Sequence, residues 1–322
     1  MPRYLVTGCA GFIGSTLVEA LLAEGCEVVG VDSFNDYYPP ALKEAAIAPA
    51  RSHPDFTLTA CDLAQSLPAE ALDGVEGIFH LAGRPGVRAS WGASFRAYVD
   101  DNVLGTHRVV ELASSRGVRL VLASSSSIYG DALAYPTPED TIPAPVSPYG
   151  VTKLAGEQLA AAHHRNAGLD LVALRNFSIY GPRQRPDMAF SRIIGALVEE
   201  TVFEVYGDGH QSRDFTYVGD AVGATVDAMR RAPSGAVYNV GAGSEASLRE
   251  AVAVIEELSG RLVDVRYGEP APGDVPRTLA ETTKIRGDLG WEPRVSLRDG
   301  LAAMLDAAGL AVPRLNGSLD RS

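Results

Sequence analysis

Tyr149 and Lys153 are spaced for acid–base chemistry, because the segment SPYGVTK at 147–153 sets them one helical turn apart. A free phenol ionises near pH ~10, so a tyrosine that accepts a proton near neutrality needs a neighbouring cation, which Lys153 can supply. A serine from the upstream run ASSSSIYG at 123–130 can hydrogen-bond the same substrate hydroxyl. The combination indicates the centre of a hydride-transfer enzyme.

A chance pair on a solvated helix is the alternative interpretation. The 322 residues include 12 tyrosines and the lysines Lys43, Lys153 and Lys284, so chance gives a Tyr-x-x-x-Lys pair in roughly one such chain in ten. The pair therefore needs support from elements that could position a hydride acceptor.

A strand, a glycine turn and a helix follow one another at the N-terminus. YLVTG at 4–8 predicts a buried strand, Gly8, Gly11 and Gly14 come next, and 15–25 has helical periodicity. Glycines let the backbone approach a pyrophosphate, and the first amides of the helix attract its charge. The order predicts a dinucleotide site, although the spacing is not the strict G-x-G-x-x-G fingerprint. A turn that merely closes a strand–helix unit is the alternative.

A carboxylate ends the second expected strand, at 27–31. Asp32 lies about 20 residues beyond the glycine turn, where an acidic side chain can bind the hydroxyls of an adenosine ribose. It would also repel the 2′-phosphate of NADP, and the next residue is Ser33, not an arginine. We therefore expect NAD as the cofactor.

Composition indicates a globular protein with no nucleic-acid or membrane partner. Hydrophobic residues make up 46% of the chain, enough for the core of an α/β domain and a smaller lobe. The net charge of −12 disfavours nucleic acid and anionic lipid. MPRYLVTG runs directly into the first expected strand, so we expect no cleavable signal, and no apolar run reaches the ~18 residues of a membrane span. Cys9, Cys26 and Cys61 indicate a reducing cytoplasm, and neither they nor the histidines show metal-ligand spacing.

Strands and helices alternate along the first half of the chain. Strands are expected at 56–60, 77–82, 118–125 and 169–176, and helices near 98–116 and 149–167. This alternation predicts an α/β protein with a Rossmann-type doubly wound parallel sheet, whose ligands lie outside the carboxyl ends of the strands. Asp62 and Leu81-Ala82-Gly83 fall at such ends. They could reach adenine and line the dinucleotide groove, or simply form a turn and a packed strand end.

The pattern loosens after Asn176, where loops rich in Pro, Gly and Arg separate shorter strands from helices near 190–200, 219–231, 247–259 and 297–308. We expect a smaller α/β lobe that binds the substrate. The expected division is an NAD-binding domain at 1–175, to which 213–235 returns, a substrate lobe at 176–212 and 236–312, and a frayed polar tail at 313–322.

Taken together, the motifs resemble the extended short-chain dehydrogenase/reductases that act on sugar nucleotides. The resemblance covers nearly the whole chain, and the family's segments occur in order: TGCAGFIG (7–14), HLAGRPGVRAS (80–90), SSSSIYG (124–130), SPYGVTK (147–153), LRNFSIYGP (174–182), RDFTYVGD (213–220) and DLGWEP (288–293). It implies that Ser125 is the hydroxyl partner of Tyr149 and that Lys153 also binds the nicotinamide ribose. It also implies a homodimer paired through the helices near 98–116 and 149–167.

Within this family, the chain is most similar to UDP-glucuronic acid 4-epimerases in the segments DSFNDYYPPALK (32–43), RPGVRAS (84–90) and RPDMAF (185–190). Related dehydratases place Asp and Glu directly after the catalytic serine, and related decarboxylases keep the Glu. Here those positions are Ser126 and Ser127, so a proton donor for a leaving hydroxyl is missing and dehydration is disfavoured. Serines that satisfy only turn backbone are the alternative at Ser124 and Ser127.

The resemblance implies an epimerisation without net redox change. Tyr149 takes the proton of the sugar 4-hydroxyl while the C4 hydride passes to NAD, and the 4-keto sugar then turns over and receives the hydride on its other face. A 4-keto uronic acid can lose carbon dioxide, so hydroxyls of Ser126, Ser127 and Ser178 are expected to hold its carboxylate out of alignment. A UDP-glucose/galactose 4-epimerase, a UDP-glucuronate decarboxylase and an NAD-binding sensor without turnover are the alternatives.

Arginines are the candidates for binding the phosphates and carboxylate of a UDP-sugar. Arg213 matches the arginine with which relatives grip the diphosphate, whereas Arg192 could equally be a surface charge. Relatives usually carry a further arginine where this chain has Ala271, which Arg277 could replace. The expected substrate residues are Arg88, Ser126, Ser127, Asn176, Ser178, Arg185, Arg192, Arg213 and Asp274. The expected cofactor residues are Gly8, Gly11, Phe12, Ile13, Gly14, Asp32, Asp62, Leu63, Leu81, Ala82, Gly83, Tyr149 and Lys153.

Overall fold

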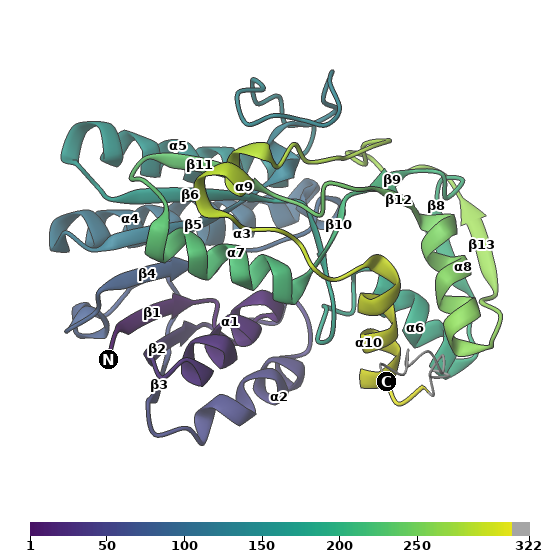
Figure 1. Cartoon of the computed structure of the whole chain (residues 1–322), viewed down its shortest axis with the longest axis horizontal. Helices are drawn as coiled ribbons and strands as arrows, with labels where there is room; N and C mark the ends of the chain where they lie inside the picture. The colour runs from purple at the N-terminus through teal and green to yellow at the C-terminus, as the bar shows by residue number, and fades with distance from the viewer. Residues whose placement is uncertain (311–322) are drawn as a thin grey trace, which may run out of the picture.

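A seven-stranded parallel sheet forms the centre of the computed structural model, which describes residues 1–310 (Figure 1). Its strands are β1 (Arg3–Thr7), β2 (Glu27–Asp32), β3 (Phe56–Ala60), β4 (Gly77–His80), β5 (Arg119–Ser125), β6 (Leu171–Asn176) and β11 (Ala236–Val240). The order is β11-β6-β5-β4-β1-β2-β3, and each neighbouring pair is parallel. The direction of winding reverses beside β1, which is where ligands of such sheets bind. The expected fold class is confirmed.

Helices cover both faces of the sheet because its strands are apolar on both sides. In β1, Val6 packs in the core under α1 and α7, whereas its neighbour Leu5 packs under α4. Successive side chains of a strand point to opposite faces, so one strand serves two cores. The helices around the sheet are α1 (Phe12–Ala23), α2 (Pro40–Arg51), α3 (Phe95–Val99), α4 (Gly105–Arg116), α5 (Pro148–Ala167), α7 (Val218–Arg231) and α9 (Thr283–Leu289).

A smaller lobe lies beside the sheet, on the right in Figure 1, and has a separate apolar core. It contains α6 (Ala189–Glu199), β8 (Phe203–Tyr206), α8 (Leu248–Ser259), β13 (Val265–Gly268) and α10 (Leu297–Ala307). Two short strand pairs lead into it: β7 (Ser178–Tyr180) with β10 (Phe215–Tyr217), and β9 (Ser212–Arg213) with β12 (Ala246–Ser247). The chain therefore enters and leaves the lobe close to the carboxyl end of β6.

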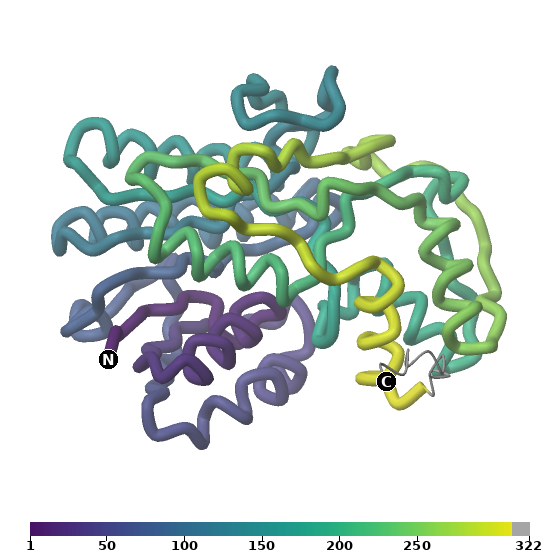
Figure 2. The backbone as a smooth tube through the Cα atoms, viewed as in Figure 1, coloured from purple at the N-terminus to yellow at the C-terminus, as the bar shows by residue number. Residues whose placement is uncertain are grey.

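The C-terminal half contributes more to the central sheet than the sequence indicated. Strand β11 pairs with β6, although 236–240 was expected in the lobe, and α9 packs against β11. Figure 2 shows the chain passing over the sheet at α9 before it reaches α10 in the lobe. The expected division into domains stays a prediction, and the expected tail at 313–322 lies outside the described residues. Among the helices of residues 1–310, none combines the length and apolar character that a membrane span needs.

The expected helix near 98–116 is interrupted by a π-helical turn. Between α3 and α4, residues Asp100–Leu104 form this wider turn, and Asn102 at its centre is buried. The Asn102 amide nitrogen donates to Thr152 Oγ1 and to the Arg84 carbonyl, both at 2.9 Å, and its oxygen accepts from the Arg84 amide at 2.6 Å. The turn thus fixes the loop after β4 against α5. Such turns are common at functional sites.

Candidate active site

One cavity of about 840 Å³ lies along the carboxyl ends of the central strands and extends to the lobe. Every residue that the sequence predicted for catalysis, cofactor binding or substrate binding lines this cavity. Residues from β1, β2 and β4 form one end, those from β5 and α5 the middle, and those from the lobe the other end. The fold thus brings the predicted residues together, while their individual roles stay predictions.

The glycine turn after β1 fits a pyrophosphate. Gly8 has φ +71, and a methyl group at Gly14 would collide with the Gly8 carbonyl oxygen, so both positions require glycine. Helix α1 begins after Gly11 with no side-chain cap and no acidic residue in its first turn. Its first amides therefore remain available to an anion in the cavity. These residues fit the phosphates of a dinucleotide.

Asp32 presents a fixed carboxylate at the same end of the cavity. Its two oxygens accept hydrogen bonds from the amides of Ala10 at 3.1 Å and Phe34 at 2.9 Å. Asp62 binds the Ala64 amide and the Gln65 side chain, each at 2.9 Å, and so closes the turn after β3 while lining the cavity. Both carboxylates lie where an adenosine would be bound in a sheet of this topology.

Tyr149 and Lys153 project from the first turns of α5 into the middle of the cavity. Ser147 caps this helix by accepting from the Gly150 amide at 3.1 Å. The Lys153 ammonium donates to the Ala123 carbonyl at 2.5 Å. Burial lowers the pKa of Lys153 to about 8, although the nearby Glu157 carboxylate opposes this shift. Lys153 therefore loses its charge as the pH rises through about 8.

The phenol of Tyr149 faces opposing influences. Burial raises its pKa, whereas the Ser125 hydroxyl and the positive charge of Arg185 act to lower it. Arg185 thus contributes a cation that the sequence did not assign to this role, beside the one predicted for Lys153. Ser125 ends β5, and its hydroxyl accepts from the Ser127 amide at 3.2 Å, which fixes the serine beside the phenol.

A buried polar network supports the catalytic residues from behind. Glu157 accepts from the Ser124 hydroxyl at 2.6 Å and forms an ion pair with Arg175 at 2.7 Å. Arg175 also donates to the Tyr129 hydroxyl at 2.8 Å, which donates to Asn239 at 2.8 Å. The Ser124 hydroxyl thus bonds a carboxylate and not the turn backbone that was the alternative for it, and both Ser124 and Tyr129 belong to this network. The network joins β5, α5, β6 and β11 below the cavity floor.

Near the lobe, two polar side chains have hydrogen-bonding or charge capacity that residues 1–310 leave unused. The Asn176 side-chain oxygen is buried and has no hydrogen-bond partner within residues 1–310, which is costly unless a ligand binds it. Arg213 forms no ion pair in that part of the chain, because the nearby Asp274 pairs with Arg88, and the Arg213 guanidinium donates to the Ser212 carbonyl at 2.8 Å. Burial lowers the pKa of Arg213. The Arg213 guanidinium suits a diphosphate, whereas the Asn176 oxygen is an acceptor and suits a hydroxyl or N–H group of a ligand.

The remaining predicted arginines are already engaged. Arg88 pairs with Asp274 at 2.6 Å, and its guanidinium lies 4.1 Å from the Tyr206 ring centre. Arg192 donates to the Glu204 carbonyl at 2.9 Å while lining the cavity. Arg277 pairs with Glu245 at 2.6 Å and does not line the cavity, so it does not replace the arginine missing at Ala271.

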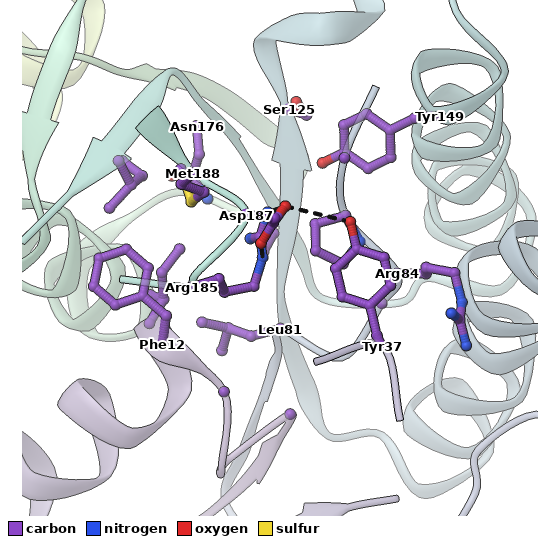
Figure 3. Close-up of a pocket in the computed structure, with 18 of the residues that line it drawn as sticks. Phe12, Tyr37, Leu81, Arg84, Ser125, Tyr149, Asn176, Arg185, Asp187 and Met188 are labelled. Carbon is purple, nitrogen blue, oxygen red and sulfur yellow. Dashed lines mark hydrogen bonds and ion pairs between the residues drawn. The ribbon is translucent and has the colours of Figure 1, made fainter. Parts of the chain in front are cut away.

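Figure 3 shows a cluster that sequence reasoning missed, in which Tyr37 and Asp187 lie beside Arg185 and below Tyr149. The Tyr37 hydroxyl donates to Asp187 at 3.4 Å, and Asp187 pairs with Arg185 at 3.0 Å. Arg84 borders the same cluster. The segments 32–43, 84–90 and 185–190 had been singled out by resemblance, but nothing local marked these individual side chains.

Comparison with known proteins identifies the family. A sequence model described as the NAD dependent epimerase/dehydratase family matches residues 4–241. The chain belongs to this family. Its description gives the cofactor as NAD, as expected from Asp32, and the turn after β1 fits that dinucleotide. The resemblance to extended short-chain dehydrogenase/reductases acting on sugar nucleotides is confirmed.

Relatives of this epimerase/dehydratase are similar over almost their whole length. The chain is 40% identical to an uncharacterized UDP-glucose epimerase of Bacillus subtilis (strain 168), over 93% of this chain and 95% of the relative. It is 38% identical to the UDP-glucuronate 4-epimerase of Thermodesulfobacterium geofontis (strain OPF15), over 94% of each. The crystal structure of UDP-glucuronic acid 4-epimerase from Bacillus cereus with UDP-glucuronic acid and NAD matches with a TM-score of 0.92, at 38% identity and over 95% and 99% of the two chains.

The position of Asp32 predicts a preference for NAD over NADP. Replacing it, as Asp32→Asn, should weaken NAD binding about tenfold, because a charge-assisted hydrogen bond to the ribose is lost, and should strengthen NADP binding. Isothermal titration calorimetry measures both. Asp36→Ala is the matched control, since Asp36 is exposed in the same segment and does not line the cavity. Tighter binding of NADP than of NAD by the unaltered protein would contradict the assignment.

Proposed function

We propose that this protein interconverts UDP-glucuronate and UDP-galacturonate by NAD-dependent inversion at C4. The observation that carries the proposal is the convergence of Tyr149, Ser125 and Arg185 in one cavity with the dinucleotide turn. No carboxylic acid follows Ser125, where a dehydratase would need a proton donor. The names of the relatives from Thermodesulfobacterium geofontis and Bacillus cereus support the same activity.

The side chains divide the work of the reaction. Bound NAD would accept a hydride from C4 and return it. Tyr149, as phenolate, takes the proton of the 4-hydroxyl and later gives it back, while Ser125 orients that hydroxyl. The charge of Arg185 lowers the pKa of the phenol within a buried site, and Lys153 is the second cation proposed to favour the phenolate. Because hydride and proton both return, the sugar is inverted with no net oxidation.

The substrate is proposed to lie between β6 and the lobe. Arg213 binds the diphosphate, since its guanidinium has no ion-pair partner among residues 1–310. The unused buried oxygen of Asn176 accepts a hydrogen bond from a hydroxyl or N–H group of the substrate. The short hydroxyls of Ser126, Ser127 and Ser178 line the same cavity. They can hold the C-5 carboxylate of a 4-keto uronate out of line with the carbonyl, which retards loss of carbon dioxide.

A UDP-glucose/galactose 4-epimerase is the second candidate, because it needs the same proton relay and because the relative from Bacillus subtilis is named as an uncharacterized UDP-glucose epimerase. The cation at Arg185 favours the uronate, since a neutral hydroxymethyl group has no need for a guanidinium beside it. Chromatography of the nucleotide sugars after separate incubation with UDP-glucuronate and UDP-glucose distinguishes the two activities.

A homodimer in the cytoplasm is also proposed. Leu104, at the end of the π-helical turn, and Val151, on α5, are 43% and 48% exposed, so the helices that would pair present apolar side chains. The three cysteines are free, which is in keeping with a reducing compartment.

Replacing the proposed base should abolish inversion. Tyr149→Phe is expected to lower turnover of UDP-glucuronate about a thousandfold, because a positioned acid–base group contributes on that order. The variant should still bind NAD, which is checked by measuring the nucleotide released from the protein. Tyr267→Phe is the matched control, since this tyrosine is exposed on the lobe outside the cavity. Near-normal turnover by Tyr149→Phe would refute its role.

Introducing a charge on the proposed dimer face should separate the subunits. Leu104→Glu is expected to convert the dimer into a monomer, because the apolar contact would have to bury an unpaired carboxylate. Sedimentation velocity measures the masses, and Leu262→Glu is the control, since Leu262 is exposed on the lobe, away from α4 and α5. A monomeric unaltered protein would rule out this assembly.

A further inference from the structure

Asp187 holds the guanidinium of Arg185 by two parallel hydrogen bonds. Arg185 Nε donates to Asp187 Oδ1 at 3.0 Å, and Nη2 donates to Oδ2 at 3.1 Å. The side chain of Arg185 is only 16% exposed, whereas that of Asp187 is 41% exposed. Solvent therefore screens the carboxylate more than the cation, and the pairing acts chiefly on the direction of the guanidinium.

The pairing uses one edge of the guanidinium and leaves the other free. Asp187 occupies the edge formed by Nε and Nη2, and Arg185 Nη1 donates no hydrogen bond within the described part of the chain. A guanidinium can bind a second carboxylate through its Nη1–Nη2 edge. Arg185 and Tyr149 both line the cavity, and the charge of Arg185 acts on the phenol, so the guanidinium lies near the middle of the cavity, where C4 would react.

Tyr37 fastens Asp187 to two other segments. Its hydroxyl donates to Asp187, and its ring lies 5.8 Å from the Arg185 guanidinium and 5.4 Å from that of Arg84. A side chain at Gly86, which has φ +99, would collide with the Tyr37 hydroxyl. The segments 32–43, 84–90 and 185–190 thus meet at one tyrosine (Figure 3).

We propose that Asp187 is a positioning residue that orients Arg185 so that its free edge receives the C-5 carboxylate of the sugar. Asp187 thereby helps the site to distinguish carboxylated from neutral UDP-sugars. This role rests on the proposed activity toward UDP-glucuronate. Without the Asp187 carboxylate, the side chain of Arg185 regains rotamers that binding of the sugar must then freeze. The entropy lost in freezing them removes part of the affinity of Arg185 for an anion.

Binding of two ligands to the NAD-loaded enzyme tests the role of Asp187. UDP-glucuronate carries the C-5 carboxylate, and UDP-xylose lacks it while keeping the remaining ring. Asp187→Asn should raise the Kd for UDP-glucuronate about tenfold, because one charge-assisted bond is lost and the fork is no longer held. The Kd for UDP-xylose should change little, and its retention shows that the variant is folded. Isothermal titration calorimetry measures both constants.

A neighbouring ion pair provides the matched control. Glu19 on α1 binds Arg183 by two hydrogen bonds, at 2.6 and 2.8 Å, in the same loop as Arg185, and neither residue lines the cavity. Glu19→Gln should leave both Kd values unchanged. Three outcomes with Asp187→Asn would each overturn the role of Asp187. They are an equal rise in the Kd values of both ligands, no rise in the Kd for UDP-glucuronate, and tighter binding of UDP-glucuronate.

The same titrations separate this inference from the proposed function. If the unaltered enzyme binds UDP-glucuronate no more tightly than UDP-xylose, its preference for a uronate is wrong and the role of Asp187 fails with it. If the unaltered enzyme prefers UDP-glucuronate and Asp187→Asn keeps that preference in full, only the role of Asp187 is rejected.

Discussion

Burial of the acid–base pair is the constraint to which the rest of the site responds. Removing Tyr149 and Lys153 from water disfavours the charged form of each, raising the pKa of the phenol and lowering that of the ammonium to about 8. Both groups must nevertheless be charged for a proton to leave the substrate. Neighbouring charges and hydrogen bonds, from Ser125, Arg185 and Glu157, offset part of this burial. A dry site is still useful, since water would compete for the proton and the hydride.

The sheet and the network beneath it supply these charges with little freedom to move. Ser125 ends β5, and the ion pair between Glu157 and Arg175 ties α5 to β6 directly behind it. Breaking a buried ion pair leaves an uncompensated charge, which costs about 3–5 kcal/mol. The pair is therefore also a structural requirement. At the opposite end, the lobe contributes Arg213 and Asp274, so the cavity is complete only where the two parts of the fold meet.

Local patterns in the sequence predicted the parts of the site that depend on one segment. The glycine turn, Asp32 and the α5 pair each follow from spacing along a strand or helix, and all line the cavity. Contacts between distant segments left no such signal. Tyr37 and Asp187 lie 150 residues apart, and Arg88 and Asp274 lie 186 residues apart. Strand β11 was expected in the lobe because the sequence of its five residues, Ala236–Val240, does not indicate which strand they pair with.

In the proposed reaction, the hydrogen removed from C4 returns to the same carbon without exchanging with solvent. Incubating the protein with NAD and UDP-glucuronate in heavy water, followed by magnetic resonance of the isolated nucleotide sugars, tests this directly. We expect UDP-galacturonate with ordinary hydrogen at C4. Deuterium at C4 of the product would show that the proton exchanges through a carbanion, and would contradict hydride transfer as the basis of inversion.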